Sequence, residues 1–185
     1  MDGSGKTPLA FGLAERIPAK VVSVDRFLNR NRGSYVQHLQ RQQLRKTIFS
    51  YHGPVIVEGV CLRSVLRRLR LRAFRHIYVK AVSQHGLWSD ERECELQGPV
   101  EAFLEIEREY LRVLDDFLTS DNAGNSEPVG LCAFREEVIR YHALALPSRY
   151  AHFVFLRRPV MPNNALQRTL RKRRASELRR WAPRY

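Results

Sequence analysis

The sequence is poor in cysteine and has no long apolar run, and each absence excludes a class of protein. Its three cysteines, Cys61, Cys94 and Cys132, are far apart and form no Cys-x-x-Cys pair. This pattern argues against a disulfide framework or a zinc site and favours reduced, packed thiols in a cytoplasmic protein. The longest apolar runs, such as 153–156, fall far short of the roughly 18 residues that span a bilayer. The first residues have no signal-peptide pattern, so we expect neither membrane insertion nor secretion.

Acidic residues are scarce at one end of the chain. Basic residues outnumber acidic ones by 32 to 19, but ten of the basic side chains and only one acid lie in residues 157–185. Residues 1–156 hold the remaining 22 basic and 18 acidic side chains, and therefore a charge of only +4. A hydrophobic content of 44% is ordinary for a globular protein. We therefore expect a globular domain over 1–156 and a basic tail over 157–185 that is flexible or partly helical.

Helical and strand patterns alternate along residues 1–156. Helices are predicted at 9–17, 35–51, 62–71, 134–144 and, beyond the break at Gly98-Pro99, in the acidic stretch 90–116. Strands are predicted at 20–24, 55–57, 76–79 and 151–156. Such alternation is typical of an α/β fold in which helices flank a parallel sheet.

A phosphate-binding pattern opens the chain. In Gly3-Ser4-Gly5-Lys6-Thr7, the glycines let backbone amides converge on phosphate oxygens, and the following helix adds positive potential at its N-terminus. Lys6 is suited to the terminal phosphates, and the Thr7 hydroxyl is suited to Mg²⁺. The complete pattern requires a further glycine five residues before Gly5 and a buried strand before that. Neither lies within these 185 residues, so we expect a fold that is incomplete at its N-terminus.

Four segments in register resemble the P-loop kinases of the uridine kinase-like, small-molecule kinase type. The segment 2–7 is similar to the phosphate loop of that family, and 23–27 is similar to its Asp-x-Phe segment after the second strand. The segment 55–59 looks like the family's strand that ends in Glu-Gly, and 141–151 looks like the approach to its last strand. The resemblance implies a three-layer P-loop NTPase fold with a central parallel sheet. It also implies ATP and Mg²⁺ as cofactors and a small hydroxyl compound, nucleoside-like or similar, as phosphate acceptor.

Two carboxylates follow predicted strands and are candidates for the chemistry. The resemblance implies that Asp25 contacts the acceptor hydroxyl, and phosphoryl transfer needs a carboxylate to orient that hydroxyl. Glu58 is the candidate second acid, which would help to hold Mg²⁺ or the substrate. The residues alone leave alternatives open, because Asp25 is also suited to a helix or turn cap and Glu58 to a structural ion pair with a nearby arginine.

Three features depart from the family pattern. Pro8 has no N–H to give to a phosphate, although proline is tolerated in a first helical turn. The region expected to form a lid offers only Arg92, with Arg149 as an alternative. Lys80 and His152 stand where the family usually has aspartates, so substrate choice cannot be carried over.

Three functions follow from these observations. The leading hypothesis is an ATP-dependent phosphotransferase, a small-molecule kinase, and the lack of the first strand leaves open whether this chain is active. The second is a nucleotide-binding protein without transferase activity, and the third is an RNA-binding protein that acts through its basic tail.

Overall fold

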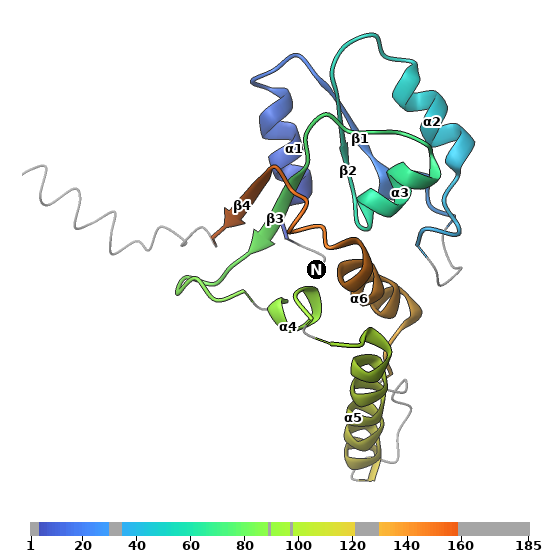
Figure 1. Ribbon diagram of the computed structural model, residues 1–185, viewed down its shortest axis with the longest axis vertical. Coiled ribbons are helices and arrows are strands. Elements are labelled where there is room, and N and C mark those ends of the chain that lie inside the picture. Colours follow the sequence, from blue (N-terminus) through green and yellow to red (C-terminus); the bar gives the residue numbers. More distant parts are fainter. Residues whose placement is uncertain (1–3, 30–34, 89, 97, 121–129, 159–185) are drawn as a thin grey trace, which may run out of the picture.

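The computed structural model describes residues 4–29, 35–88, 90–96, 98–120 and 130–158 (Figure 1). In chain order the elements are α1 (Lys6–Ala14), β1 (Lys20–Ser23), the short 3-10 helix η1 (Val24–Phe27), α2 (Arg41–Phe49), β2 (Val55–Glu58), α3 (Leu62–Arg68), β3 (Ile77–Ala81), α4 (Glu91–Cys94), α5 (Val100–Ser120), α6 (Ala133–Ala145) and β4 (Phe153–Arg157). Helices alternate with strands, and the paired strands are parallel. The fold class is therefore α/β. Gly3 and the predicted tail beyond Arg158 lie outside the described residues.

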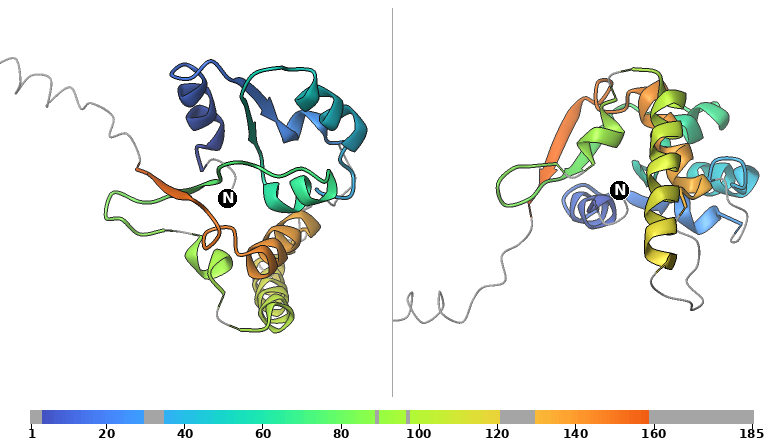
Figure 2. Two further views of the ribbon diagram at one scale, coloured as in Figure 1. Left: turned by 45° about the horizontal axis from the view of Figure 1, so that its top comes forward. Right: turned by 90° about the horizontal axis from the view of Figure 1, so that it is seen from below.

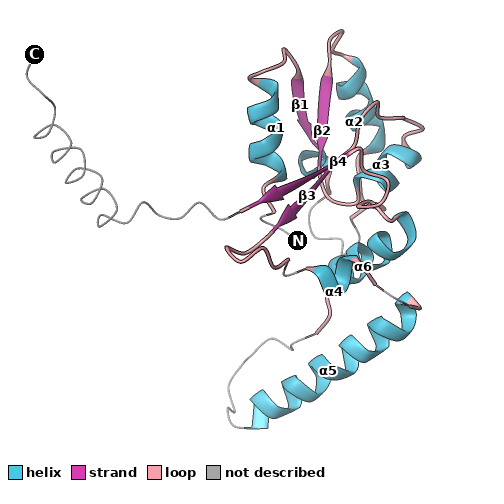
Figure 3. Ribbon diagram, turned by 60° about the vertical axis from the view of Figure 1, so that its left-hand side comes forward, coloured by secondary structure: helices cyan, strands magenta, loops and turns pink. Residues whose placement is uncertain are grey.

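The strands form two separate parallel pairs. β1 pairs with β2, which sets Ser23 opposite Glu58, and β3 pairs with β4, which sets Ala81 opposite Arg157. Figures 1 and 3 show these pairs as distinct two-stranded ribbons. The parallel sheet that we expected, incomplete at its N-terminal end, is divided into two small parallel sheets in the described part of the chain. The physical reason is that no described strand lies between β2 and β3 to carry the hydrogen-bond ladder across.

The main core lies beside the β1–β2 pair. Val24, Leu44 and Val65 are fully buried, and they come from η1, α2 and α3. β-branched residues at 21–22 and 55–57 suit a buried parallel strand, because their side chains pack well on a pleated surface. Helix α1 packs on the same pair, while α6 lies against α3, α4 and α5. Figure 2 shows α6 between the α/β body and the projecting helix α5.

The predicted helix over 35–51 is shorter in the structure. It forms only as α2, and the residues ahead of it are turns that bury Tyr35, Val36 and Leu39. The backbone N–H of Val36 donates to the Glu137 carboxylate over 2.9 Å, and Leu39 forms an isolated antiparallel bridge with Leu28. The bridge and the Glu137 carboxylate tie this segment to distant parts of the chain, so tertiary contacts override the helical pattern.

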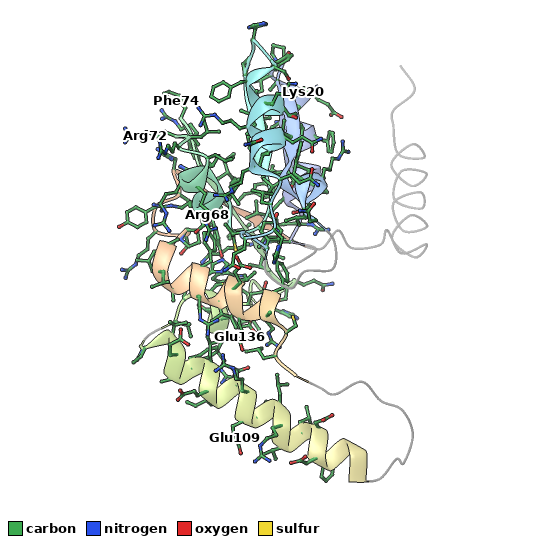
Figure 4. All side chains as sticks on the ribbon, turned by 90° about the vertical axis from the view of Figure 1, so that its right-hand side faces the viewer. Lys20, Arg68, Arg72, Phe74, Glu109 and Glu136 are labelled. Carbon is green, nitrogen blue, oxygen red and sulfur yellow. The ribbon has the colours of Figure 1, made fainter. Side chains whose placement is uncertain are left out.

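The acidic helix α5 is held to α6 by ion pairs. Arg140 contacts Glu101 at 2.8 Å and Glu136 at 2.9 Å, and Arg108 contacts Glu136 at 2.7 Å. Figure 4 labels Glu136 on α6, on the side that faces α5. No helix among the described residues is both long and apolar enough to cross a membrane.

Candidate active site

The predicted phosphate loop begins helix α1. Gly5 caps the helix with a backbone φ of +92°, in the left-handed region that glycine adopts without steric cost. Ser4 is buried, and the Lys6 ammonium donates to its hydroxyl over 2.9 Å. Helix α1 starts at Lys6, and the N–H groups at the start of a helix point out of its end and not to carbonyl groups within the helix. This end of α1 therefore has the positive potential and the side chains that suit an anion.

Glu58, the candidate second acid, lies against the predicted phosphate loop. It ends β2, and its Oε2 accepts a hydrogen bond from the Thr7 hydroxyl over 3.2 Å. Its second oxygen, Oε1, is buried and has no hydrogen-bond partner among the described residues. A buried carboxylate oxygen without a partner is costly, so this arrangement suits a cation. The structure shows no ion pair between Glu58 and an arginine, which was the structural alternative, within the described residues.

Asp25 lies in η1, immediately after β1, and is exposed. Its Oδ1 accepts a hydrogen bond from the hydroxyl of Tyr35, a residue that the sequence reasoning did not single out. Burial, followed by the Asp25 carboxylate, raises the pKa of Tyr35 far above its usual value, so the phenol stays protonated and acts as a donor. The structure gives no direct contact between Asp25 and the phosphate loop.

Gly59, which follows Glu58, packs closely against Val24 and Tyr35. A Cβ at Gly59 would lie 2.8 Å from Cβ of Val24 and 3.1 Å from the Tyr35 hydroxyl. Only a residue without a side chain permits this packing. The glycine that follows Glu58 therefore places the end of β2 against the segment that holds Asp25.

Arg157 is a site residue that the sequence reasoning missed. It was assigned to the basic tail, but it is the last residue of β4 and lies over the phosphate loop. A Cβ on Gly5 would lie 2.3 Å from Cδ of Arg157 and 3.0 Å from its Nε. The pairing of β4 with β3 brings the guanidinium to this place. The only signal in the sequence was its position at the end of the predicted last strand.

The other candidate arginines do not reach the site through any contact that the structure shows. Arg92 pairs with Glu107 at 2.7 Å and stacks over Phe103, so it is engaged by α5. Arg149 is exposed beyond the end of α6. Lys80 pairs with Glu95 at 2.7 Å. These side chains therefore have structural partners or lie in solvent. Among the described contacts, Arg157 is the arginine that comes closest to Gly5.

The described residues contain no cluster of three or more His, Cys, Asp or Glu side chains that could hold a metal ion. A cation at Thr7 and Glu58 would thus need further ligands from a bound phosphate or from water. The structure brings together Ser4, Gly5, Lys6, Thr7 and Glu58, and it joins Asp25 to them only indirectly. No protein-family model, curated protein or solved structure matches the chain.

Proposed function

We propose that this chain is a P-loop kinase-like protein that binds ATP with Mg²⁺ and transfers phosphate to a small hydroxyl compound. The observation that carries the proposal is the hydrogen bond between Thr7 and Glu58, which leaves one buried carboxylate oxygen without a partner next to a glycine-started helix. A hydroxyl and a carboxylate side by side at a phosphate loop are oxygen ligands of the type that Mg²⁺ prefers.

Each site residue has a role that its position supports. The ammonium of Lys6 would neutralise charge on the terminal phosphates, and the first-turn N–H groups of α1 would donate to phosphate oxygens. Thr7 and Glu58 would hold Mg²⁺, which when bound neutralises charge on the phosphates. Arg157 would add a second cation beside Gly5. The carboxylate of Asp25 would accept a hydrogen bond from the acceptor hydroxyl and orient it.

Equilibrium binding of ATP, measured with and without Mg²⁺, tests the nucleotide site. We expect Lys6→Ala to weaken binding at least about tenfold, because one direct cation–phosphate contact is lost. Lys20→Ala is the matched control, since Lys20 is an exposed lysine at the opposite, amino end of β1. Glu58→Gln should weaken binding only when Mg²⁺ is present. Equal affinities of the Lys6 and Lys20 variants would overturn the phosphate-loop assignment.

A panel of nucleosides, sugars and other small alcohols tests the transfer step. The protein is incubated with ATP and Mg²⁺, and release of ADP with each acceptor is compared with release in its absence. A compound that raises ADP release and is itself found phosphorylated identifies the class of acceptor.

A second candidate function is nucleotide binding without transfer. It is favoured by the ion pair of Arg92 with Glu107, which ties the expected lid arginine to α5, and by Pro8, which removes one possible phosphate donor. ATP binding with no stimulated ADP release over the whole panel would support it. The RNA-binding alternative depends on the tail, whose residues from 159 onward lie outside the described part of the chain.

A further inference from the structure

A basic cavity lies at the end of helix α3, away from the phosphate loop. It has a volume of about 670 Å³, and none of the described phosphate-loop residues lines it. His76 and His152, which come directly before β3 and β4, form part of its wall, whereas the phosphate loop lies at the carboxyl end of β4. We call it the arginine cavity, because four arginines line it: Arg63, Arg67, Arg70 and Arg72.

These four arginines have no acidic partner in the part of the chain that the structure describes. The sequence has no acid between residues 59 and 89 that could supply one locally. Arg63 is held in place, since its guanidinium lies over the Tyr150 ring at 4.2 Å from the ring centroid. Its Nη1 is buried and has no hydrogen-bond partner among the described residues. Repulsion between unpaired cations and an unpaired buried donor are both costly, so the cavity suits an oxyanion.

The backbone at Arg70 is strained at the edge of this cavity. Its φ is +54°, in the left-handed region. The N–H of Arg70 donates to the Arg67 carbonyl over 3.1 Å, and the N–H of Leu71 donates to the Leu66 carbonyl over 2.9 Å. Glycine is the usual residue at the left-handed position of such a helix end, and a side chain there costs free energy. Strain of this kind is concentrated at functional sites, so the arginine at this position favours a role in binding.

Stabilisation of helix α3 does not account for all of these cations. Basic side chains in a last turn stabilise the carbonyl end of a helix, and this explains Arg67 and Arg68. Arg70 and Arg72 lie beyond the end of α3, yet they line the same cavity. Four cations around one cavity match several neighbouring phosphates better than a single one.

Phe74 indicates the kind of phosphate chain that fits. It lines the cavity, is 83% exposed, and has the Arg75 guanidinium over its ring at 4.1 Å from the centroid. Figure 4 shows Phe74 on the same side of the molecule as Arg68 and Arg72. Exposed aromatic rings and arginine planes are surfaces on which the bases of single-stranded nucleic acids stack. Residues 59–79 contain six arginines and no lysine, and the planar guanidinium is suited both to phosphate and to bases.

We infer that the arginine cavity binds a segment of single-stranded nucleic acid, with its phosphates on the four arginines and one base stacked on Phe74. A concave site admits a flexible strand, whereas the flat surface of an anionic membrane does not enter it. This inference depends neither on nucleotide binding at the phosphate loop nor on the basic tail.

Fluorescence anisotropy with a labelled oligouridine of about 12 nucleotides tests the phosphate contacts on the full chain. Arg67→Gln with Arg72→Gln should weaken binding at least about tenfold and make the slope of log affinity against log salt shallower by about 1.4, because each lost contact removes about 0.7. The matched control is Arg41→Gln with Arg112→Gln, which removes the same charge from exposed positions on α2 and α5. Equal effects of the two pairs would overturn the proposal.

Arg70→Gly separates binding from folding. It removes a cation from the cavity but places glycine where the backbone is left-handed, so the unfolding temperature should not fall while the oligouridine binds at least about threefold more weakly. Unchanged binding of this variant would contradict the assignment of Arg70 to the site.

An abasic oligomer of the same length tests the stacked base. The parent chain should bind it at least about fivefold more weakly than oligouridine, and Phe74→Ala should remove this difference. Equal binding of both oligomers to the parent chain would show a site for any polyanion and would overturn the nucleic-acid assignment. Binding to phosphatidylserine vesicles in place of oligouridine would show instead that the arginines face a membrane.

Photocrosslinking with 5-bromouridine in the oligomer locates the site in the presence of the tail. We expect crosslinked peptides from residues 63–76, and crosslinks confined to 159–185 would overturn the proposal. Lys6→Ala should change neither the affinity for oligouridine nor the crosslinks. Failure of ATP binding would therefore leave this inference standing, and loss of oligouridine binding in the Lys6 variant would move the site to the phosphate loop and overturn it.

Discussion

At the scale of single residues, the hydrogen bond from Tyr35 to Asp25 defines how the candidate base is held. Asp25 is exposed, so solvent or an acceptor reaches its carboxylate, while the protonated phenol of Tyr35 fixes one of its oxygens. Tyr35 is itself fixed, since it is buried and packs against Phe134 with a ring centroid distance of 5.7 Å. Asp25 thus has one oxygen oriented by the protein and one available for another partner.

This arrangement predicts different effects for two variants. Asp25→Asn keeps the size of the side chain but removes its charge and basicity, so turnover of the acceptor identified above should fall by about 10²- to 10⁴-fold, with ATP binding nearly unchanged. Tyr35→Phe leaves the carboxylate in place and removes one hydrogen bond, so we expect a loss of about tenfold or less. Steady-state kinetics of both variants check this. If Asp25→Asn turns over at the parent rate, Asp25 is a structural cap.

The cysteines allow a second prediction at this scale. Burial raises the pKa of the Cys61 thiol to about 12, and burial likewise raises the pKa of Cys94 to about 12. Because the thiolate is the reactive form, both should resist alkylation between pH 7 and 9 in the folded protein. Cys132 is exposed and should be alkylated first. Mass spectrometry after iodoacetamide treatment should find modification at Cys132 alone until the protein is unfolded; early modification of Cys61 would contradict this.

At the scale of elements, helix α1 has one glycine at its N-cap and a second within it. Gly5 is the left-handed cap, where an added Cβ would also meet Arg157. Gly12 lies in the helix and has nothing within 4 Å of an added Cβ. Substitution at Gly5 therefore tests a position where the backbone requires glycine, and substitution at Gly12 tests one where it does not.

Gly5→Ala should destabilise the protein by roughly 1–2 kcal/mol, because a residue with a Cβ is strained in the left-handed region. It should also weaken ATP binding, since Arg157 and the loop must shift. Gly12→Ala is the matched control and should stabilise by about 0.5–1 kcal/mol, because alanine loses less backbone entropy in a helix. Thermal or urea unfolding measures both changes. A neutral Gly5→Ala variant with unchanged ATP affinity would show that the loop conformation is unimportant.

At the scale of the whole molecule, positive charge is concentrated in two places. Residues 159–185 contain eight basic side chains and one acid. The second place is α3 and the segment after it, where five arginines are exposed: Arg67, Arg68, Arg70, Arg72 and Arg75. Figure 4 shows Arg68, Arg72 and Phe74 on this side of the α/β body. Between 59 and 89 the sequence has no acid to offset these arginines.

Removal of residues 159–185 tests which of these two basic regions binds nucleic acid. If the tail is responsible, retention on RNA should be lost at about 0.15 M salt in the shortened chain, because fewer counterions are released on binding. ATP affinity should not change, since the described site ends at Arg157. Retention that persists, and that Arg68→Glu with Arg72→Glu then abolishes, would assign the binding to the arginine face instead.

The sequence by itself determined the α/β class, the presence of a helix after the predicted phosphate-binding segment and the uneven charge, because these depend on local periodicity, glycine and composition; α1 itself lies three residues ahead of the predicted bounds 9–17. The positions of β1, β2 and α3 were predictable for the same reason. Only the tertiary structure decided that Glu58 faces Thr7, that Tyr35 holds Asp25 and that Arg157 covers Gly5, since these contacts join residues far apart in the chain. It also decided that residues 35–40 leave the helical pattern, because Leu39 bridges to Leu28 and the N–H of Val36 donates to Glu137 on α6. The division of the strands into two pairs is likewise a long-range property, since a ladder between β2 and β3 needs a strand that local patterns in the described residues do not supply.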